Sequence, residues 1–175
     1  MSTSSKAPNG SSKIRTTLSL DLGMDLGYSI FDGIKENHGY CEFKAQHEGD
    51  SYFLYLNWLK ATISKHNVND ILFEEVEGIW KNKYAQRYYF GFRAVTSMAA
   101  YYFGCKMIGY NQITAKTKVI GNFRADKVDI MTHFRNRGFD VTTDDEADAL
   151  MISHLHQMVL SGEVDLTKPK KKKKR

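Results

Sequence analysis

The sequence LSLDLGMDLGYSIFD, at residues 18–32, gives the clearest indication of the fold. It belongs to a β-rich run that starts at 16 and leads to Asp21. Two glycines follow, Gly23 and Gly27, and both suit tight turning of the chain. The stretch therefore predicts a strand that ends in a carboxylate, a glycine-containing turn and a second strand.

Strand-like and helix-like segments alternate along the rest of the chain. The expected elements are strands at 28–32 and 38–43 around an Asp32-Gly33 turn, a helix with Asp50 as its N-cap, the strand ILFEEV at 71–76, a helix at 83–103 that stops at Gly104, a strand at 106–110, a short helical piece at 114–120, a helix at 125–137 and a last helix at 145–161. Because strands alternate with helices, the sequence predicts an α/β domain with a mixed sheet.

Length and charge indicate one folded domain between two basic ends. The chain has 175 residues, and we expect a domain at 16–163, a disordered basic leader at 1–15 and a disordered Lys-rich tail at 164–175. The net charge is +5, but ten of the 25 Lys and Arg residues lie in 1–15 and 168–175. The residues between them carry 15 basic against 20 acidic side chains, so the folded part is acidic.

Composition also bears on the compartment. No run of about 18 uncharged apolar residues is present, which excludes a membrane-spanning protein. The N-terminus lacks the apolar core of a secretory signal, and Cys41 and Cys105 read as reduced thiols of the core. We expect a cytoplasmic, DNA-associated protein. In a eukaryotic host the tail PKKKKKR would favour nuclear targeting, although it is equally typical of polyanion tethering or of a solubilising segment.

Four acidic residues occur where apolar elements end. Asp21 follows TTLSL, Glu74 follows ILF, and Asp145 and Asp148 open the last helix, three residues apart on one face. A helix cap for the last two, and solvent-facing strand ends for the first two, are alternatives. However, carboxylates placed directly against core residues are costly without a cation. Such hard oxygen ligands suit Mg²⁺ or Mn²⁺, and two such ions can drive phosphodiester hydrolysis.

The order of these motifs resembles the RuvC family of Holliday junction resolvases, within the RNase H-like superfamily. The resemblance runs from Leu18 to His156 and rests on LSLDLGMDLGYSIFD, ILFEEV, KTKVIGNFRADK and DEADALMISHLH. It implies an RNase H-like fold, with a five-stranded mixed sheet of three antiparallel then two parallel strands flanked by α-helices. It also implies that Asp21, Glu74, Asp145 and Asp148 hold two Mg²⁺ ions per subunit, with Mn²⁺ as a substitute. Lys116 and Lys127 match the family's lysines near the scissile phosphate.

The activity that this resemblance implies is a magnesium-dependent crossover junction endodeoxyribonuclease. A homodimer would resolve four-way junctions and branched DNA by symmetrical paired nicks, in DNA recombination, repair or viral genome processing. The departures favour a divergent phage or viral member: Leu22 replaces the usual proline, Asp25 is an extra acid, and EGIWKNKYAQRYY after the second acidic strand is long and polar. Glu74 rather than Glu75 takes the ligand position by the motif register.

Basic and aromatic residues suitable for DNA gather in two stretches. Lysine and arginine neutralise phosphates, and aromatic rings stack on unpaired bases. The candidate DNA-binding residues are Trp80, Lys81, Lys83, Arg87, Lys116, Lys118, Arg124 and Lys127. Solvated surface charge is the alternative for the basic residues, and a core or dimer interface is the alternative for Tyr84, Tyr88, Tyr89 and Phe92.

Two other functions stay open at this stage. One is an RNase H-like nuclease that acts on flaps or RNA, and the other is a catalytically silent nucleic-acid-binding scaffold of the same fold. The intact set of four acids argues against the scaffold.

Overall fold

The computed structural model describes residues 15–76 and 82–167. Its strands are β1 (Thr17–Asp21), β2 (Asp25–Phe31), β3 (Glu36–Glu42), β4 (Asp70–Glu74) and β5 (Lys106–Tyr110). Its helices are α1 (Glu48–His66), α2 (Lys83–Phe103), the one-turn α3 (Gln112–Ala115), the π-helix η1 (Lys116–Ile120), α4 (Lys127–Arg135) and α5 (Asp144–Leu160). No helix in these described ranges has the length and apolarity needed to cross a membrane.

The strands form one mixed sheet in the order β3-β2-β1-β4-β5. β1, β2 and β3 pair antiparallel, whereas β4 and β5 run parallel to β1. The predicted sheet, three antiparallel strands and then two parallel ones, is confirmed. Because β1, β4 and β5 are parallel, their carboxyl ends meet at one edge of the sheet. Leu20 pairs with Phe73, so Asp21 and Glu74 come next on adjacent strands.

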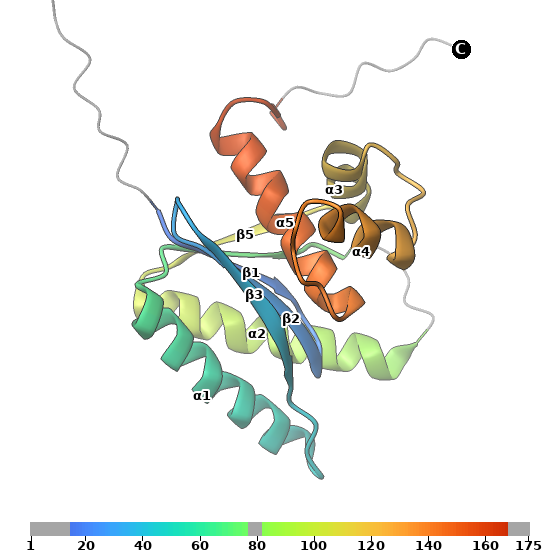
Figure 1. Cartoon of the computed structure of the whole chain (residues 1–175). Coiled ribbons are helices and arrows are strands. Elements are labelled where there is room, and N and C mark those ends of the chain that lie inside the picture. The colour runs from blue at the N-terminus through green and yellow to red at the C-terminus, as the bar shows by residue number, and fades with distance from the viewer. Residues whose placement is uncertain (1–14, 77–81, 168–175) are drawn as a thin grey trace, which may run out of the picture.

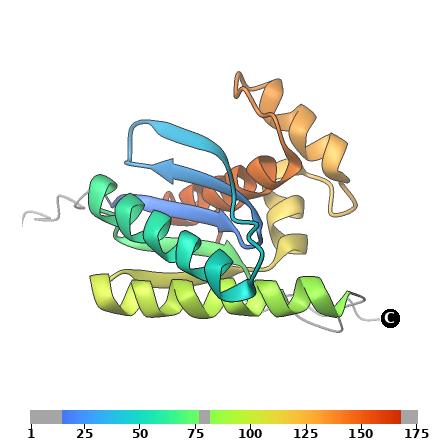
Figure 2. The same ribbon diagram turned by 90° about the horizontal axis from the view of Figure 1, so that it is seen from below.

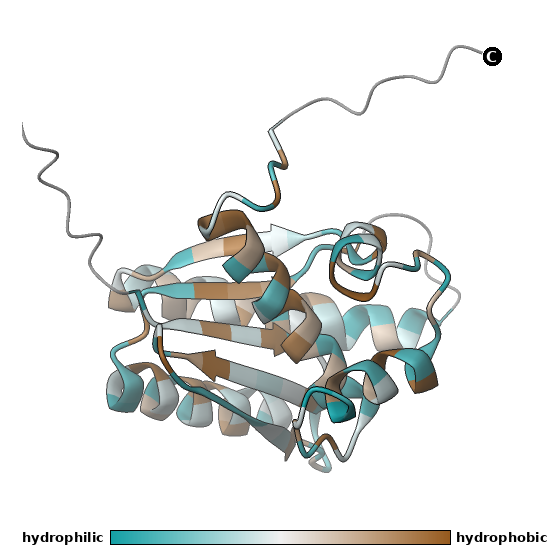
Figure 3. Ribbon diagram, turned by 45° about the horizontal axis from the view of Figure 1, so that its top comes forward, coloured by the Kyte–Doolittle hydropathy of each residue, from teal (hydrophilic) through white to brown (hydrophobic). Residues whose placement is uncertain are grey.

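Helices cover both faces of this sheet. α1 and α2 lie on one face, and α5 lies on the other with α3 and α4 beside it (Figures 1 and 2). Each face has its own apolar core, and hydrophobic residues gather along the strands of the middle layer (Figure 3). β1 is buried between the two helical layers: Leu18 and Leu20 are fully buried, and so is the polar Ser19 that lies between them.

Local signals fix the ends of the helices that matter for the site. The Asn82 side chain accepts hydrogen bonds from the backbone N–H groups of Tyr84 (3.0 Å) and Ala85 (3.2 Å), which begins α2. Gly104, at φ +70°, ends that helix where the sequence places its stop. The side chain of Thr143 caps α5 by accepting from the N–H of Glu146 (3.2 Å).

The structure corrects three local predictions. Asp50 is not the N-cap of α1, because the helix already begins at Glu48 and His47 takes the cap position. Gly27 does not lie in a turn but inside β2. The helix predicted at 125–137 is shorter, since Asp126 caps it and Lys127–Arg135 forms its body.

Residues just outside both ends of the predicted domain, 16–163, also make contacts with it. Arg15 forms a two-pronged ion pair with Asp70, with Nε and Nη2 each 2.6 Å from a carboxylate oxygen. Val164 is buried in the core on the α5 side.

Candidate active site

The four predicted acids come together at the carboxyl edge of the sheet. Asp21 and Glu74 end β1 and β4, and Asp145 and Asp148 lie in the first two turns of α5, which packs across β1 and β2. Thr143 is the N-cap of α5, so neither Asp145 nor Asp148 caps the helix, although Asp145 lies in the first turn, where the helix dipole favours an acid.

Gly27 brings α5 to the sheet. A Cβ atom at this position would overlap the backbone carbonyl of Asp145. The missing side chain therefore lets the first turn of α5 lie directly on β2. This close approach carries the Asp145 carboxylate to Asp21, with which it shares a hydrogen bond.

Burial and mutual repulsion make these carboxylates retain protons. Burial, together with the negative charges of Asp148, Asp145 and Glu74, holds the pKa of Asp21 well above its usual value. Burial and the charge of Asp148 raise the pKa of Glu74 to about 7. Burial raises the pKa of Asp148 to about 6, although nearby lysines oppose the shift. Burial and the charge of Asp144 also raise the pKa of Asp145.

The donor set fits a divalent cation. Asp148 is only 9% exposed, and its buried Oδ1 has no hydrogen-bond partner in the described part of the chain. A cation would satisfy this oxygen and replace the protons that the cluster otherwise retains. The side chains do not stand in a finished ligand geometry: in 15–76 and 82–167, no group of three or more His, Cys, Asp or Glu residues is arranged to hold a metal ion.

One lysine lies beside the acids. The Nζ of Lys116 donates to the carbonyl of Ala125 (2.8 Å), and its charge lowers the pKa of both Glu74 and Asp148. Lys127 is also near, because it pairs with Asp144 and lowers the pKa of Asp148. The structure thus brings two of the four predicted lysines and arginines of this segment to the acids.

The other two basic residues of that segment have other surroundings. Lys118 is exposed and lines a different cavity, of about 700 Å³, between β5 and the C-terminal half of α5. Arg124 is exposed and lies over the ring of Phe123, at 5.1 Å.

The N-terminal part of α2 closes another side of the cluster. A cavity of about 250 Å³ is lined by Asp21 and Asp145 of the cluster and by Tyr84, Tyr88 and Tyr89 of α2. Lys83 is exposed at the first position of α2. Arg87 is 3.2 Å from a carboxylate oxygen of Glu48, so an internal partner already binds it. The predicted DNA-binding residues Trp80 and Lys81 lie outside the described residues.

The neighbouring acids take other partners. Glu75 points away from the cluster and forms an ion pair with Arg93 (2.8 Å). Asp25 is partly exposed at the start of β2, where Lys44 lies 2.7 Å from its carboxylate and Tyr40 donates a hydrogen bond to it. Its charge still raises the pKa of Asp145, so Asp25 is near the cluster without joining it.

Sequence reasoning missed several residues that shape this site. Gln112, at the start of α3, hydrogen-bonds to Glu74, and Asp144 pairs with Lys127. The hydrogen bond between His38 and Glu146 also went unnoticed, because 108 positions separate the two residues. Of these residues, the sequence pointed only to Asp144, because it is adjacent to the predicted ligand Asp145.

Solved structures match this chain although sequence searches do not. No protein-family model and no curated protein matches the sequence. The RuvC of T. thermophilus in complex with a Holliday junction substrate matches with a TM-score of 0.72 and 15% identity, over 85% of this chain and 96% of that one. A second structure of Thermus thermophilus RuvC gives 0.69 and 16%, over 84% and 96%. The yeast mitochondrial Holliday junction resolvase gives 0.57 and 12%, over 80% and 76%. The chain therefore has the RuvC-like, RNase H-type fold that residues 18–156 predict.

Proposed function

We propose that this protein is a structure-selective DNA endonuclease that resolves four-way junctions and other branched DNA. The observation that carries the proposal is the convergence of Asp21, Glu74, Asp145 and Asp148 at the carboxyl edge of a RuvC-like sheet. Structural relatives named as Holliday junction resolvases, one of them bound to its junction, support the choice of substrate.

The four acids would hold two Mg²⁺ ions, or Mn²⁺ in their place. When bound, such ions supply an activated water and stabilise the leaving oxygen of a phosphodiester. Asp148 would contribute its buried Oδ1, which has no hydrogen-bond partner among residues 15–76 and 82–167, and Asp21 and Glu74 would contribute buried oxygens from the two strand ends. Lys116 would stabilise negative charge on the phosphate, because its ammonium is already fixed between the Ala125 carbonyl and the acids.

A homodimer would provide the two active sites that symmetrical paired nicks require. The exposed face of α2 supports this part of the proposal. Phe90 (44% exposed) and Tyr101 (91% exposed) flank the small residues Ala94 and Ser97, which are also exposed. The spacing of these residues alternates four, three and four, as in a helix-pairing seam.

This seam is self-complementary in an antiparallel arrangement. A two-fold axis at its centre places Phe90 opposite Tyr101 and Ala94 opposite Ser97. Lys83 and Arg87 lie near the N-terminus of α2, where a helix dipole disfavours cations, and α2 contains no acidic residue. In the antiparallel pair, these cations approach the C-terminal end of the partner helix, where cations are favoured. Light scattering tests the pairing: Ala94→Arg should give a monomer, and Ala61→Arg on the exposed surface of α1 should leave the dimer intact.

A nicking assay tests the function. The full chain is incubated with Mg²⁺ and a synthetic four-way junction, a flap, a linear duplex or an RNA–DNA hybrid. We expect paired nicks in the junction from the wild type and the Asp25→Asn control, and none from Asp21→Asn. Preference for the hybrid or the flap would favour the alternative nuclease, and binding without cleavage in Mg²⁺ and Mn²⁺ would favour the silent scaffold.

A further inference from the structure

Two histidine–carboxylate pairs join β3 to α5. The Nδ1 of His38 is 2.6 Å from Oε1 of Glu146, and the Nε2 of His154 is 3.0 Å from Oε2 of Glu36. The acid is on the helix in the first pair and on the strand in the second. Both imidazole rings also pack on Phe139, with centroid distances of 5.6 Å for His38 and 5.4 Å for His154.

The two pairs differ in their distance from the acidic cluster. Glu146 lies between Asp145 and Asp148 in the sequence of α5. His154 lies eight residues further along, about 12 Å down the helix axis at 1.5 Å per residue. The two pairs therefore make similar contacts at opposite ends of the interface between β3 and α5. The pair of His38 and Glu146 is at the end near the acidic cluster, and the pair of His154 and Glu36 is at the far end.

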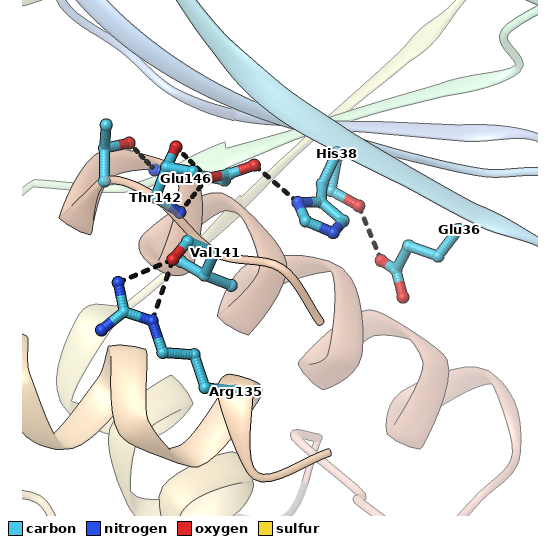
Figure 4. Close-up of polar contacts among 8 residues, drawn as sticks. Glu36, His38, Arg135, Val141, Thr142 and Glu146 are labelled. Atoms are coloured by element: carbon cyan, nitrogen blue, oxygen red, sulfur yellow. Dashed lines mark hydrogen bonds and ion pairs between the residues drawn. The ribbon is translucent and has the colours of Figure 1, made fainter. Parts of the chain in front are cut away.

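Glu146 is fully engaged and cannot itself serve as an open ligand. It is 3% exposed, and its Oε2 accepts hydrogen bonds from the N–H (2.7 Å) and the hydroxyl (3.0 Å) of Thr142 (Figure 4). Arg135 holds the preceding loop by donating from Nε (2.9 Å) and Nη2 (2.7 Å) to the carbonyl of Val141. The start of α5 is thus tied to β3 through His38 and to α4 through this loop.

This tie fixes the direction in which the first turn of α5 faces. Successive helical residues point about 100° apart, so anchoring Glu146 toward β3 determines the directions of Asp145 and Asp148. Gly27 sets the distance between α5 and β2. The hydrogen bond between Glu146 and His38 sets the direction in which the first turn of α5 faces.

We propose that His38 and Glu146 are positioning residues that aim the Asp145 and Asp148 carboxylates at the cation site, whereas Glu36 and His154 only stabilise the fold. The proposal rests on the proposed metal-dependent function. Outer residues that orient metal ligands typically change metal affinity by about 10- to 100-fold when they are replaced.

The experiment compares His38→Ala with its matched control His154→Ala. Mn²⁺ affinity is measured by titration calorimetry, and the free energy of unfolding by urea denaturation of the metal-free protein. Both substitutions remove one histidine–carboxylate pair and one contact with Phe139, and His154→Ala also removes a ring contact with Phe134, so both should lower the free energy of unfolding. Only His38→Ala should weaken Mn²⁺ binding, by about tenfold or more. His38→Asn, whose amide N–H can replace the Nδ1 donor, should restore most of the affinity.

The possible outcomes distinguish a failure of the positioning role from a failure of the proposed metal-dependent function. Equal losses of affinity in the two alanine variants, or an unchanged affinity in His38→Ala, would overturn the positioning role while the wild type still binds Mn²⁺. A wild type that does not bind Mn²⁺ would overturn the proposed function and the positioning role together.

Discussion

The backbone carbonyl of Asp145 lies directly against Cα of Gly27, so strand β2 has no room for a side chain at that position. Because both contacting groups belong to the backbone, no flexible side chain can move aside when a methyl group is added. The position of the first turn of α5, and with it two of the four acids, therefore depends on one glycine in the middle of a strand.

Gly27→Ala should displace the start of α5 and destabilise the protein by about 1–3 kcal/mol, the usual cost of overpacking. It should also weaken cleavage more than the loss of stability alone explains. The control is Gly49→Ala, because a Cβ at Gly49 in the first turn of α1 meets nothing within 4 Å. Urea denaturation and junction cleavage measure both effects, and a Gly27→Ala protein with wild-type stability and activity would contradict the close approach.

The sequence predicts much of this architecture because its signals are local. The boundaries of α2 follow from Gly104 and from helical periodicity, and β5 follows from a short apolar run. The placement of Asp21 and Glu74 at one edge of the sheet could be predicted because each of them ends an apolar strand. By contrast, Gly27 is a strand glycine whose contact lies 118 residues away, and no local pattern distinguishes it from a turn glycine. His38 and Glu146 escaped detection for the same reason.

Burial and charge repulsion within the cluster predict a pH-dependent effect of Glu74→Gln in metal-free protein. The pKa of Glu74 is raised to about 7, so folding favours its protonated form. The stability that this proton contributes is complete below about pH 4.5, the ordinary pKa of the group, and is lost as the pH rises through about 7. Glu74→Gln should therefore raise the free energy of unfolding at pH 8, relative to the wild type, and change it little at pH 4.5.

Urea denaturation in EDTA at the two pH values measures this difference. Glu75→Gln is the control, because Glu75 pairs with Arg93 outside the cluster. A stabilisation by Glu74→Gln of the same size at both pH values would show that Glu74 does not carry the raised pKa.

Lys116 and Lys118 should have separable roles although only one residue lies between them. Lys116 is fixed beside Glu74 and Asp148, whereas Lys118 is exposed over another cavity. Lys116→Ala should lower the rate of cleavage at saturating DNA by about 100-fold, as expected when a preorganised charge stabiliser is removed. Lys118→Ala should weaken DNA binding, so it should lower cleavage only at DNA concentrations that are too low to saturate the protein. Single-turnover kinetics distinguish the two, and equal rate losses would contradict the assignment.

The basic tail should contribute affinity without contributing chemistry. Residues 168–175 carry seven positive charges, and each one that contacts phosphate adds about 0.9 to the log–log salt slope of binding. Deletion of these residues should weaken junction binding and flatten its salt dependence, while cleavage stays metal-dependent. Binding isotherms over a series of salt concentrations measure this, and a deletion that abolishes cleavage at saturating DNA would contradict it.

We propose that Asp21, Glu74, Asp145 and Asp148 form one metal centre. The most direct measurement is the anomalous diffraction of crystals grown with Mn²⁺. We expect two Mn²⁺ peaks among these four carboxylates, with Oδ1 of Asp148, which has no partner in the described part of the chain, among the ligands. No peak in the cluster, or peaks only at outer acids such as Asp25 and Glu42, would contradict it.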